Sequence, residues 1–209
     1  MTPFQTDSRP VPAVRTDCLL IADDLTGACD AAVPFAAAGF ATVVPLAPEH
    51  PPGEASVLAF SSESRDIDPA AVQSRMLRLA AAVRSHVPRI VFKKIDSTLR
   101  GNTALEIIAA LDAFDCDAAV INPAFPAMGR VVESGFLRLP ADATFRPIEL
   151  GFWLHAHGAS ACRHVRPGAI GEALDSGARF ISLDAVCQDD LACIAAELIS
   201  ERRRILWAG

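Results

Sequence analysis

The sequence predicts an α/β fold in which a mostly parallel sheet carries helices on both faces, in a Rossmann-like three-layer arrangement. Short apolar runs alternate with segments of helical length, as expected of units in which a helix connects two parallel strands. The runs consist mostly of Val, Leu, Ile and Ala, so the strands are expected to be buried on both faces. With 209 residues, 51% of them hydrophobic, the chain is long enough to form one full core.

Seven runs rich in Val, Ile, Leu and Ala are predicted to be strands. They cover residues 18–22, 41–46, 56–60, 89–92, 118–121, 179–183 and 204–207. The clearest helix is predicted over residues 69–86, where Asp68 is placed as the N-cap and Pro69 occupies the first helical position. A second helix is predicted over residues 189–202, because acidic residues fill its first turn and arginines its end.

The remaining segments define the expected domain organisation. Residues 1–17 combine prolines with charged residues, and we expect them to be a flexible lead-in. Residues 18–209 are expected to form one domain, within which residues 139–168 are predicted to be irregular because prolines and glycines interrupt any period. A strand such as residues 204–207 normally leads into a loop and a helix, so we expect a further domain to be missing from this chain.

Composition narrows the class of protein and its partners. A net charge of −6 argues against a general nucleic-acid binder, whose affinity comes from neutralising phosphates. The longest uncharged run, residues 31–48, contains prolines and a glycine, so we expect no membrane span. The N-terminus does not resemble a secretion signal, and the six cysteines form no C-x-x-C pair. These features predict a reduced, cytoplasmic protein.

Two carboxylates and a hydroxyl follow the first predicted strand, in the segment IADDLTGA. Asp23, Asp24 and Thr26 would lie at the carboxyl end of a parallel strand, where open α/β sheets bind their ligands. The amides around Thr26 would also be able to hold an anion at the start of the next helix. The alternative is that Asp24 is only the N-cap of that helix.

An arginine follows another predicted strand, in the segment SSESR. The guanidinium of Arg65 has the geometry to bind a carboxylate through two parallel hydrogen bonds. The alternative is a solvated arginine in a loop, which is the commoner place for a charged residue.

The densest polar cluster is KKIDSTLRGN, between a predicted strand and a helix. Lys94 and Arg100 would offset the charge of an anionic ligand, and Ser97 and Thr98 would bind its hydroxyl groups. Asp96 would accept the proton of an attacking hydroxyl. Charges gathered at the carboxyl end of a strand favour a site for a polyhydroxylated anion over a purely structural turn.

Two other features point to chemistry less specifically. The segment NPAFPAMGR would form a stiff loop at the same edge of the sheet, in which Arg130 would face a ligand or partner, or serve only a structural turn. His155 and His157 lie near Cys162, but their spacing is unlike zinc frameworks and we expect no metal site. No phosphate-binding glycine motif follows a strand, so ATP would have to be bound outside this chain.

Four motifs together resemble the four-carbon acid sugar kinase family. They are IADDLTGA at 21–28, SESR at 62–65, KKIDSTLRGN at 93–102 and PAFPAMGR at 123–130, in the order and spacing of that family's sugar-binding N-terminal domain. The resemblance implies an ATP-dependent kinase that phosphorylates a hydroxyl of a threonate-, erythronate- or 3-oxo-tetronate-like acid. It also implies that ATP and Mg²⁺ are held mainly by a C-terminal domain that this chain lacks.

The same resemblance implies which residues line the substrate pocket, and the residue chemistry indicates the same set. They are Asp23 or Asp24, together with Arg65, Lys94, Asp96, Ser97 and Arg100. Asp24 is the preferred catalytic carboxylate and Asp96 the next, because phosphoryl transfer depends on positioning more than on a strong base. Where the family commonly has Asp-Thr, this chain has Ser61-Ser62, which would change substrate choice or weaken the pocket.

The sequence is compatible with three functions. The first is one domain of a sugar-acid kinase, which binds its small-molecule substrate but does not turn it over alone. The second is a stand-alone binding or regulatory module for a hydroxy acid. The third is a hydrolase or aldolase that uses Lys94 and Asp96 by itself. If a second domain normally covers the apolar residues around Trp207, their exposure would favour a homodimer.

Overall fold

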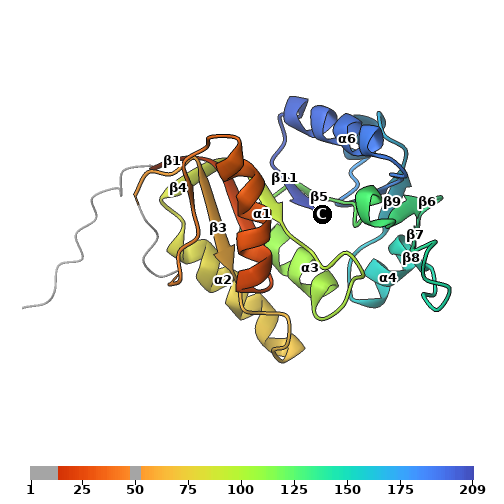
Figure 1. The fold of residues 1–209 in the computed structure, drawn as a ribbon, viewed down its shortest axis with the longest axis horizontal. Coiled ribbons are helices and arrows are strands. Elements are labelled where there is room, and N and C mark those ends of the chain that lie inside the picture. Colours follow the sequence, from red (N-terminus) through yellow and green to blue (C-terminus); the bar gives the residue numbers. More distant parts are fainter. Residues whose placement is uncertain (1–13, 48–52) are drawn as a thin grey trace, which may run out of the picture.

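The computed structural model describes residues 14–47 and 53–209, which form an eight-stranded sheet with helices on both sides (Figure 1). The strands lie in the order β2-β3-β1-β4-β11-β5-β10-β9, and neighbouring strands are parallel. Their bounds are β1 Val14–Ala22, β2 Thr42–Val43, β3 Val57–Ser61, β4 His86–Lys93, β5 Ala118–Ile121, β9 Cys162–Val165, β10 Phe180–Leu183 and β11 Ile205–Ala208. The predicted fold class is confirmed.

Helices cover each face of this sheet. The bounds are α2 Val72–Ala82, α3 Thr103–Ala113 and α4 Leu150–Ala156 on one face, and α1 Leu25–Ala37, α5 Ile170–Asp175 and α6 Gln188–Ser200 on the other. Strand β1 is buried on both sides: Leu19 and Ile21 pack in the core that includes α2 and α3, and Leu20 packs beneath α1. This double burial explains why residues 18–22 of this strand are apolar throughout.

A small antiparallel sheet extends from the carboxyl end of β5. It consists of β6 Val131–Glu133, β7 Phe136–Arg138 and β8 Ile148–Glu149, in that order. Two 3-10 turns, η1 Pro69–Ala71 and η2 Pro126–Met128, lie before α2 and before β6.

Several predicted boundaries are wrong. Strand β1 begins at Val14, so the last residues of the expected lead-in belong to a strand, while residues 1–13 lie outside the described part of the chain. The helix expected over residues 69–86 is η1 followed by α2 and ends at Ala82. His86 already opens β4, because it pairs with the start of β1 and its Nδ1 lies 3.0 Å from the hydroxyl of Thr16.

The segment expected to be irregular, residues 139–168, contains regular structure. It holds β8, α4 and the edge strand β9, which pairs with β10. The exposed or half-buried residues of β9 carry no continuous apolar run that would have revealed the strand. The strand expected over residues 41–46 is reduced to two residues, Thr42 and Val43.

The direction of strand order reverses at β1. The chain leaves β1 for the edge strand β2, continues to β3 beside β1, and then crosses to β4 on the other side of β1, so the carboxyl ends of β1, β3 and β4 adjoin one another. Ala22 pairs with Ser61 and Ile21 with Lys93, which aligns the three strand ends. Such a reversal is where ligands bind in open α/β sheets.

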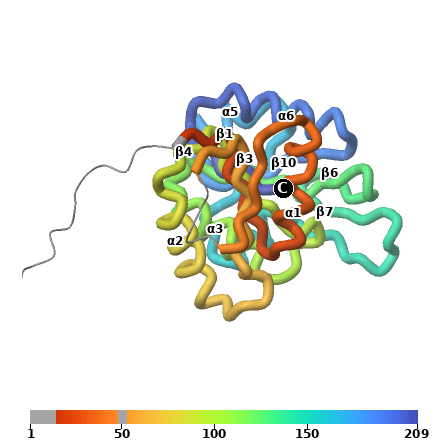
Figure 2. Tube along the Cα trace, turned by 60° about the vertical axis from the view of Figure 1, so that its left-hand side comes forward, coloured from red at the N-terminus to blue at the C-terminus, as the bar shows by residue number. Residues whose placement is uncertain are grey.

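The carboxyl end of β11 reaches the same edge. The chain runs to Gly209 between α1 and α6 (Figures 1 and 2). Its carbonyl oxygen accepts a hydrogen bond of 2.9 Å from the backbone N–H of Ile95, just after β4. The end of β11 therefore holds the loop after β4 in place.

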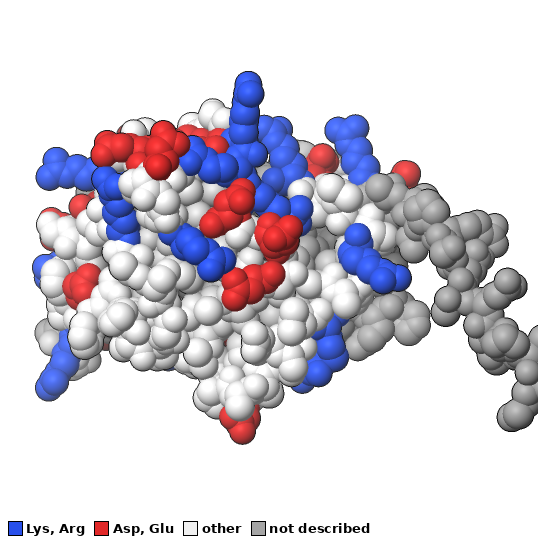
Figure 3. Space-filling model, turned by 180° about the vertical axis from the view of Figure 1, so that it is seen from behind, with Lys and Arg blue, Asp and Glu red and all other residues white. Residues whose placement is uncertain are grey.

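Charges on the surface are mixed in sign. On the face opposite to that of Figure 1, acidic and basic side chains lie interspersed, mostly on its upper part (Figure 3). The face shown has no basic stripe of the kind typical of nucleic-acid binders, and the net charge of the chain is −6. Within the described residues, none of the helices has the length and apolar character needed to span a bilayer.

Candidate functional site

The loop after β1 places two carboxylates at the reversal of strand order. Asp24 is the N-cap of α1: its backbone is extended, and its Oδ1 accepts a hydrogen bond of 2.6 Å from the N–H of Gly27. A Cβ at Gly27 would approach that oxygen to 2.9 Å, so glycine allows the carboxylate its position. Asp23 is almost completely buried, whereas 30% of the Asp24 side chain is exposed. Asp24 is thus a cap that also faces the site.

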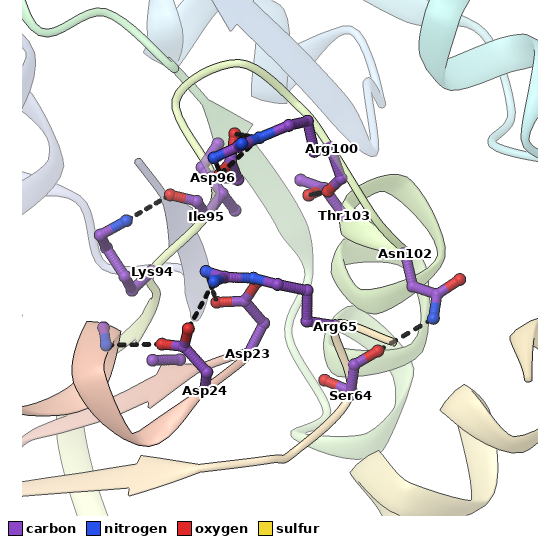
Figure 4. A network of polar contacts seen from close by, with 12 residues as sticks. Asp23, Asp24, Ser64, Arg65, Lys94, Ile95, Asp96, Arg100, Asn102 and Thr103 are labelled. Atoms are coloured by element: carbon purple, nitrogen blue, oxygen red, sulfur yellow. Dashed lines mark hydrogen bonds and ion pairs between the residues drawn. The ribbon is translucent and has the colours of Figure 1, made fainter. Parts of the chain in front are cut away.

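The loop after β3 brings Arg65 against both carboxylates (Figure 4). Its Nε and Nη2 donate to Asp23 at 2.7 and 3.1 Å, and its Nη1 forms an ion pair with Asp24. The hydrogen bond to Asp23 raises the pKa of Arg65, although burial opposes this effect. Arg65 thus binds a carboxylate through two hydrogen bonds, as expected, but this carboxylate is Asp23 of the protein itself.

The loop after β4 contains a second ion pair. Asp96 accepts hydrogen bonds from the backbone N–H and hydroxyl of Thr98, at 2.8 and 2.5 Å, and from Nη2 of Arg100 at 2.7 Å. Burial alone would raise the pKa of Asp96, but the hydrogen bonds from Arg100 and Thr98 hold it well below its usual range. Arg100 covers this carboxylate from outside, with 76% of its side chain exposed.

Among the described residues, Lys94 and Ser97 take part in neither of these ion pairs. They help line a cavity of about 640 Å³ that also borders α1, the loop after β5 and Gly209. The Nζ of Lys94 donates to the carbonyl of Ile95 at 2.5 Å, and Arg130 donates to the hydroxyl of Ser97 at 2.6 Å. Burial lowers the pKa of Lys94, although the nearby Asp23 and Asp96 partly counter this.

A buried network beneath the site holds the loops together. Lys93 and Glu106 are fully buried and form an ion pair at 2.9 Å. Glu106 also accepts a hydrogen bond of 2.5 Å from the hydroxyl of Ser64, next to Arg65. The amide of Asn102 donates to the carbonyls of Ser64 and Ile67, each at 2.9 Å. The loop after β4 and helix α3 thus position the loop that carries Arg65.

Sequence reasoning missed this support. Lys93, Asn102 and Glu106 were not among the predicted site residues. Glu106 had one detectable signal: it is a carboxylate on the inner side of an otherwise apolar helix, between the buried residues Thr103 and Ile107. A charge in such a position must be paired, and its partner then lies nearby.

The structure brings the predicted residues to one edge of the sheet. Asp23, Asp24 and Arg65 form one cluster, Asp96, Thr98 and Arg100 a second, and Lys94 and Ser97 border the adjoining cavity. Thr26 lies exposed in the first turn of α1. Across residues 14–47 and 53–209, no group of three or more His, Cys, Asp and Glu side chains is arranged to hold a metal ion.

Comparison with protein families gives a match over much of the chain. The family described as "Sugar-binding N-terminal domain" matches residues 18–149, which is more than half of the chain. All three of the loops that build the site fall within this range.

Curated relatives include a D-erythronate kinase of Heliobacterium modesticaldum and a D-threonate kinase of Cupriavidus necator. The first is 31% identical, and the alignment covers 86% of this chain and 47% of the relative. The second is 33% identical, and the alignment covers 91% of this chain and 51% of the relative. The chain thus spans about half the length of these relatives. Their names confirm the resemblance that the motifs indicated.

Solved structures share the fold. A Bordetella bronchiseptica protein, described as a domain of unknown function and as a domain-swapped dimer with bound citrate, superposes with a TM-score of 0.79 at 28% identity. The match covers 92% of this chain and 53% of that protein. A Haemophilus influenzae protein matches with a TM-score of 0.75 at 22% identity, covering 91% and 53%, which supports the fold alone.

Proposed function

Because the chain belongs to the family of sugar-binding N-terminal domains, we propose that it forms the sugar-acid site of an ATP-dependent kinase. The substrate class is a four-carbon acid of the threonate, erythronate or 3-oxo-tetronate type, which are the substrates named for its relatives. The observation that carries this proposal is the convergence of Asp23, Asp24, Arg65 and Lys94 at the reversal of strand order.

Asp24 is the carboxylate that we assign to the attacking hydroxyl. Its side chain is more exposed than that of Asp23, so it is able to accept a hydrogen bond from a substrate. Its ion pair with Arg65 and its bond to Gly27 fix its direction, and phosphoryl transfer depends chiefly on such positioning. Asp96 is the weaker candidate, because its side chain is buried and its hydrogen bonds from Arg100 and Thr98 hold its pKa well below the usual range, which makes it a poor proton acceptor.

ATP and Mg²⁺ are assigned to the part of the relatives that this chain does not cover. The carboxylates at the site are already bound to Arg65 and Arg100, so the described residues offer no donor set suited to Mg²⁺. Bound ATP would supply the phosphoryl group, while the residues of this chain bind and orient the acceptor. We therefore expect the chain alone to bind the acid without turning it over.

The proposed partners and location follow from the same assignment. The citrate bound to the Bordetella bronchiseptica protein is a hydroxy acid, the chemical class proposed for the ligand of this chain. That protein is also a dimer, and we propose a homodimer for this chain as well, with the cytoplasm as its location.

Calorimetric titration without nucleotide tests the proposal. Wild-type chain and an Arg65→Ala variant are titrated with D-threonate, D-erythronate and L-threonate. We expect the wild type to select among the three acids. In the variant the affinity should fall at least about tenfold, because two uncompensated carboxylates would then repel the anion.

Arg179→Ala is the matched control. Arg179 precedes β10 and pairs with Asp112 at the surface, away from the site loops. Its removal should leave the affinities unchanged. If the wild type binds none of the acids, or if both variants bind as well as the wild type, the proposed sugar-acid site is wrong.

A further inference from the structure

We propose that Arg130 and Lys94 bind the carboxylate of the acid, in the cavity between α1 and the loops after β4 and β5. This inference rests on the proposed function and assigns one end of the ligand to a residue outside the expected pocket. Arg65, the residue expected to hold that carboxylate, instead orients Asp23 and Asp24.

First, the four cations at the site differ in whether a carboxylate of the protein already pairs with them. Arg65 and Arg100 are each paired with carboxylates of the protein. Among the described residues, Lys94 and Arg130 form no such pair and donate only to neutral oxygens, the carbonyl of Ile95 and the hydroxyl of Ser97. A ligand carboxylate is a stronger acceptor than either oxygen, so these two cations gain most from binding it.

The second argument is that the backbone holds Arg130 in place. Phe125 and Arg130 exchange two backbone hydrogen bonds, of 2.8 and 3.1 Å, across a turn that Gly129 completes with φ of +67°. The loop is anchored at its start by Asn122, whose side chain bonds the carbonyl of Leu183 and the N–H of Ala124 at 3.0 and 2.9 Å. Because the backbone at Arg130 is held in place, less conformational entropy is lost when its guanidinium binds a ligand.

The third argument is the character of the cavity. Its volume of about 640 Å³ falls within the usual range of small-molecule sites. Phe35, Phe92 and Phe125 contribute apolar walls, so charge interactions inside it are screened less than in water. Asp30 of α1 also lines the cavity, but it is an exposed residue.

The geometry also gives the ligand a direction. Lys94 borders the cavity, and it is also close enough to Asp23 and Asp96 for their charges to affect its pKa. It therefore lies between the cavity and the carboxylates at the strand ends. A short acid with its carboxylate at Arg130 and Lys94 would extend toward Asp24, where the reacting hydroxyl is expected. The cavity would then select acids over neutral polyols.

The test compares an acid with its neutral amide. Wild type, Arg130→Ala, Arg130→Lys and the control Arg179→Ala are titrated with D-threonate and with D-threonamide, which keeps the hydroxyl groups but lacks the charge. We expect Arg130→Ala to weaken threonate binding roughly tenfold to a hundredfold, the range of a charged hydrogen bond, with threonamide affinity unchanged. Arg130→Lys should retain most of the threonate affinity, because it keeps the positive charge.

The outcomes separate this inference from the proposed function. If Arg130→Ala binds threonate as tightly as Arg179→Ala does, the carboxylate lies elsewhere and only the inference is overturned. Equal losses for threonate and threonamide would also overturn it, since they would indicate a general disturbance of the loop. If the wild type binds no acid, both the inference and the proposed function are wrong.

Discussion

At the scale of single residues, the site is organised by pairing of opposite charges. Asp96 shows this most clearly, because its oxygens are occupied by Thr98 and Arg100. The same turn occurs at Asp142, which accepts bonds from the N–H and hydroxyl of Thr144 at 2.9 and 2.6 Å. Asp142 is exposed and, among the described residues, has no arginine partner. A comparison of the two positions therefore isolates the effect of burial and of Arg100 on the carboxylate.

This contrast predicts the pH dependence of stability. Since the pKa of Asp96 is lowered in the folded state, its contribution is present above about pH 4, the unfolded value, and is lost as the pH falls toward the folded pKa. Asp96→Asn should therefore cost about 1–2 kcal/mol of unfolding free energy at pH 7, after allowing for the exposure of Arg100, and less at pH 3. Urea unfolding at both pH values measures the difference.

Asp142→Asn is the control for this experiment. It should change the unfolding free energy much less at neutral pH, because its bonds to Thr144 are exposed to water. A cost of Asp96→Asn that is the same at pH 3 and pH 7 would contradict the account, since it would show that the lost stability does not depend on ionisation.

The residues that sequence could predict share one property. Asp23, Asp24, Arg65 and Lys94 each lie within three or four positions of the end of an apolar run, so the parallel topology alone brings them together. Their partners could not be predicted in this way. That Arg65 turns to Asp23 depends on the register of β1 with β3, which is fixed only in the folded sheet.

At the scale of elements, the loop after β4 is locked against the loop after β3. Gly101 adopts φ of +67°, and a Cβ there would lie 2.9 Å from the carbonyl oxygen of Arg65. Gly39, after α1, has a similar φ of +88°, but a Cβ there would meet no atom within 4 Å. Both glycines thus adopt a positive φ, but only Gly101 lies close to another loop.

Alanine substitution of both glycines separates these effects. Gly39→Ala should cost about 1–2 kcal/mol of unfolding free energy through the left-handed backbone alone. Gly101→Ala should cost about 1–3 kcal/mol more, because the loop carrying Arg65 must move, and it should also weaken acid binding. Urea unfolding and calorimetric titration of the two variants check this. Equal costs for both, with unchanged binding, would show that the loops are not locked together.

The accuracy of the predicted elements follows from how each is buried. Strand β5 was predicted at its observed bounds because all four of its residues are buried and apolar. The end of the helix over residues 69–86 was misplaced because its apolar pattern continues to Val83, which is buried after the helix has ended. Strand β9 was missed because it lies at the edge of the sheet, where its residues need not be apolar.

At the scale of the whole molecule, the topology of the sheet creates the site. Strand order reverses at β1, which sets the loops after β1, β3 and β4 beside one another, and β11 closes the same edge through Gly209. The loop after β4 also buries Ile95 and Leu99 in the core, while the polar residues of the three loops gather at the edge of the sheet. We therefore expect a sugar acid to bind where the three loops meet.

A crystal structure of the chain with its preferred four-carbon acid tests that claim most directly. We predict the acid at the carboxyl ends of β1 and β4, with one of its oxygens within about 3.2 Å of Asp24 and another within the same distance of Lys94. An acid bound elsewhere on the molecule, with no contact to the loops after β1 and β4, would contradict it.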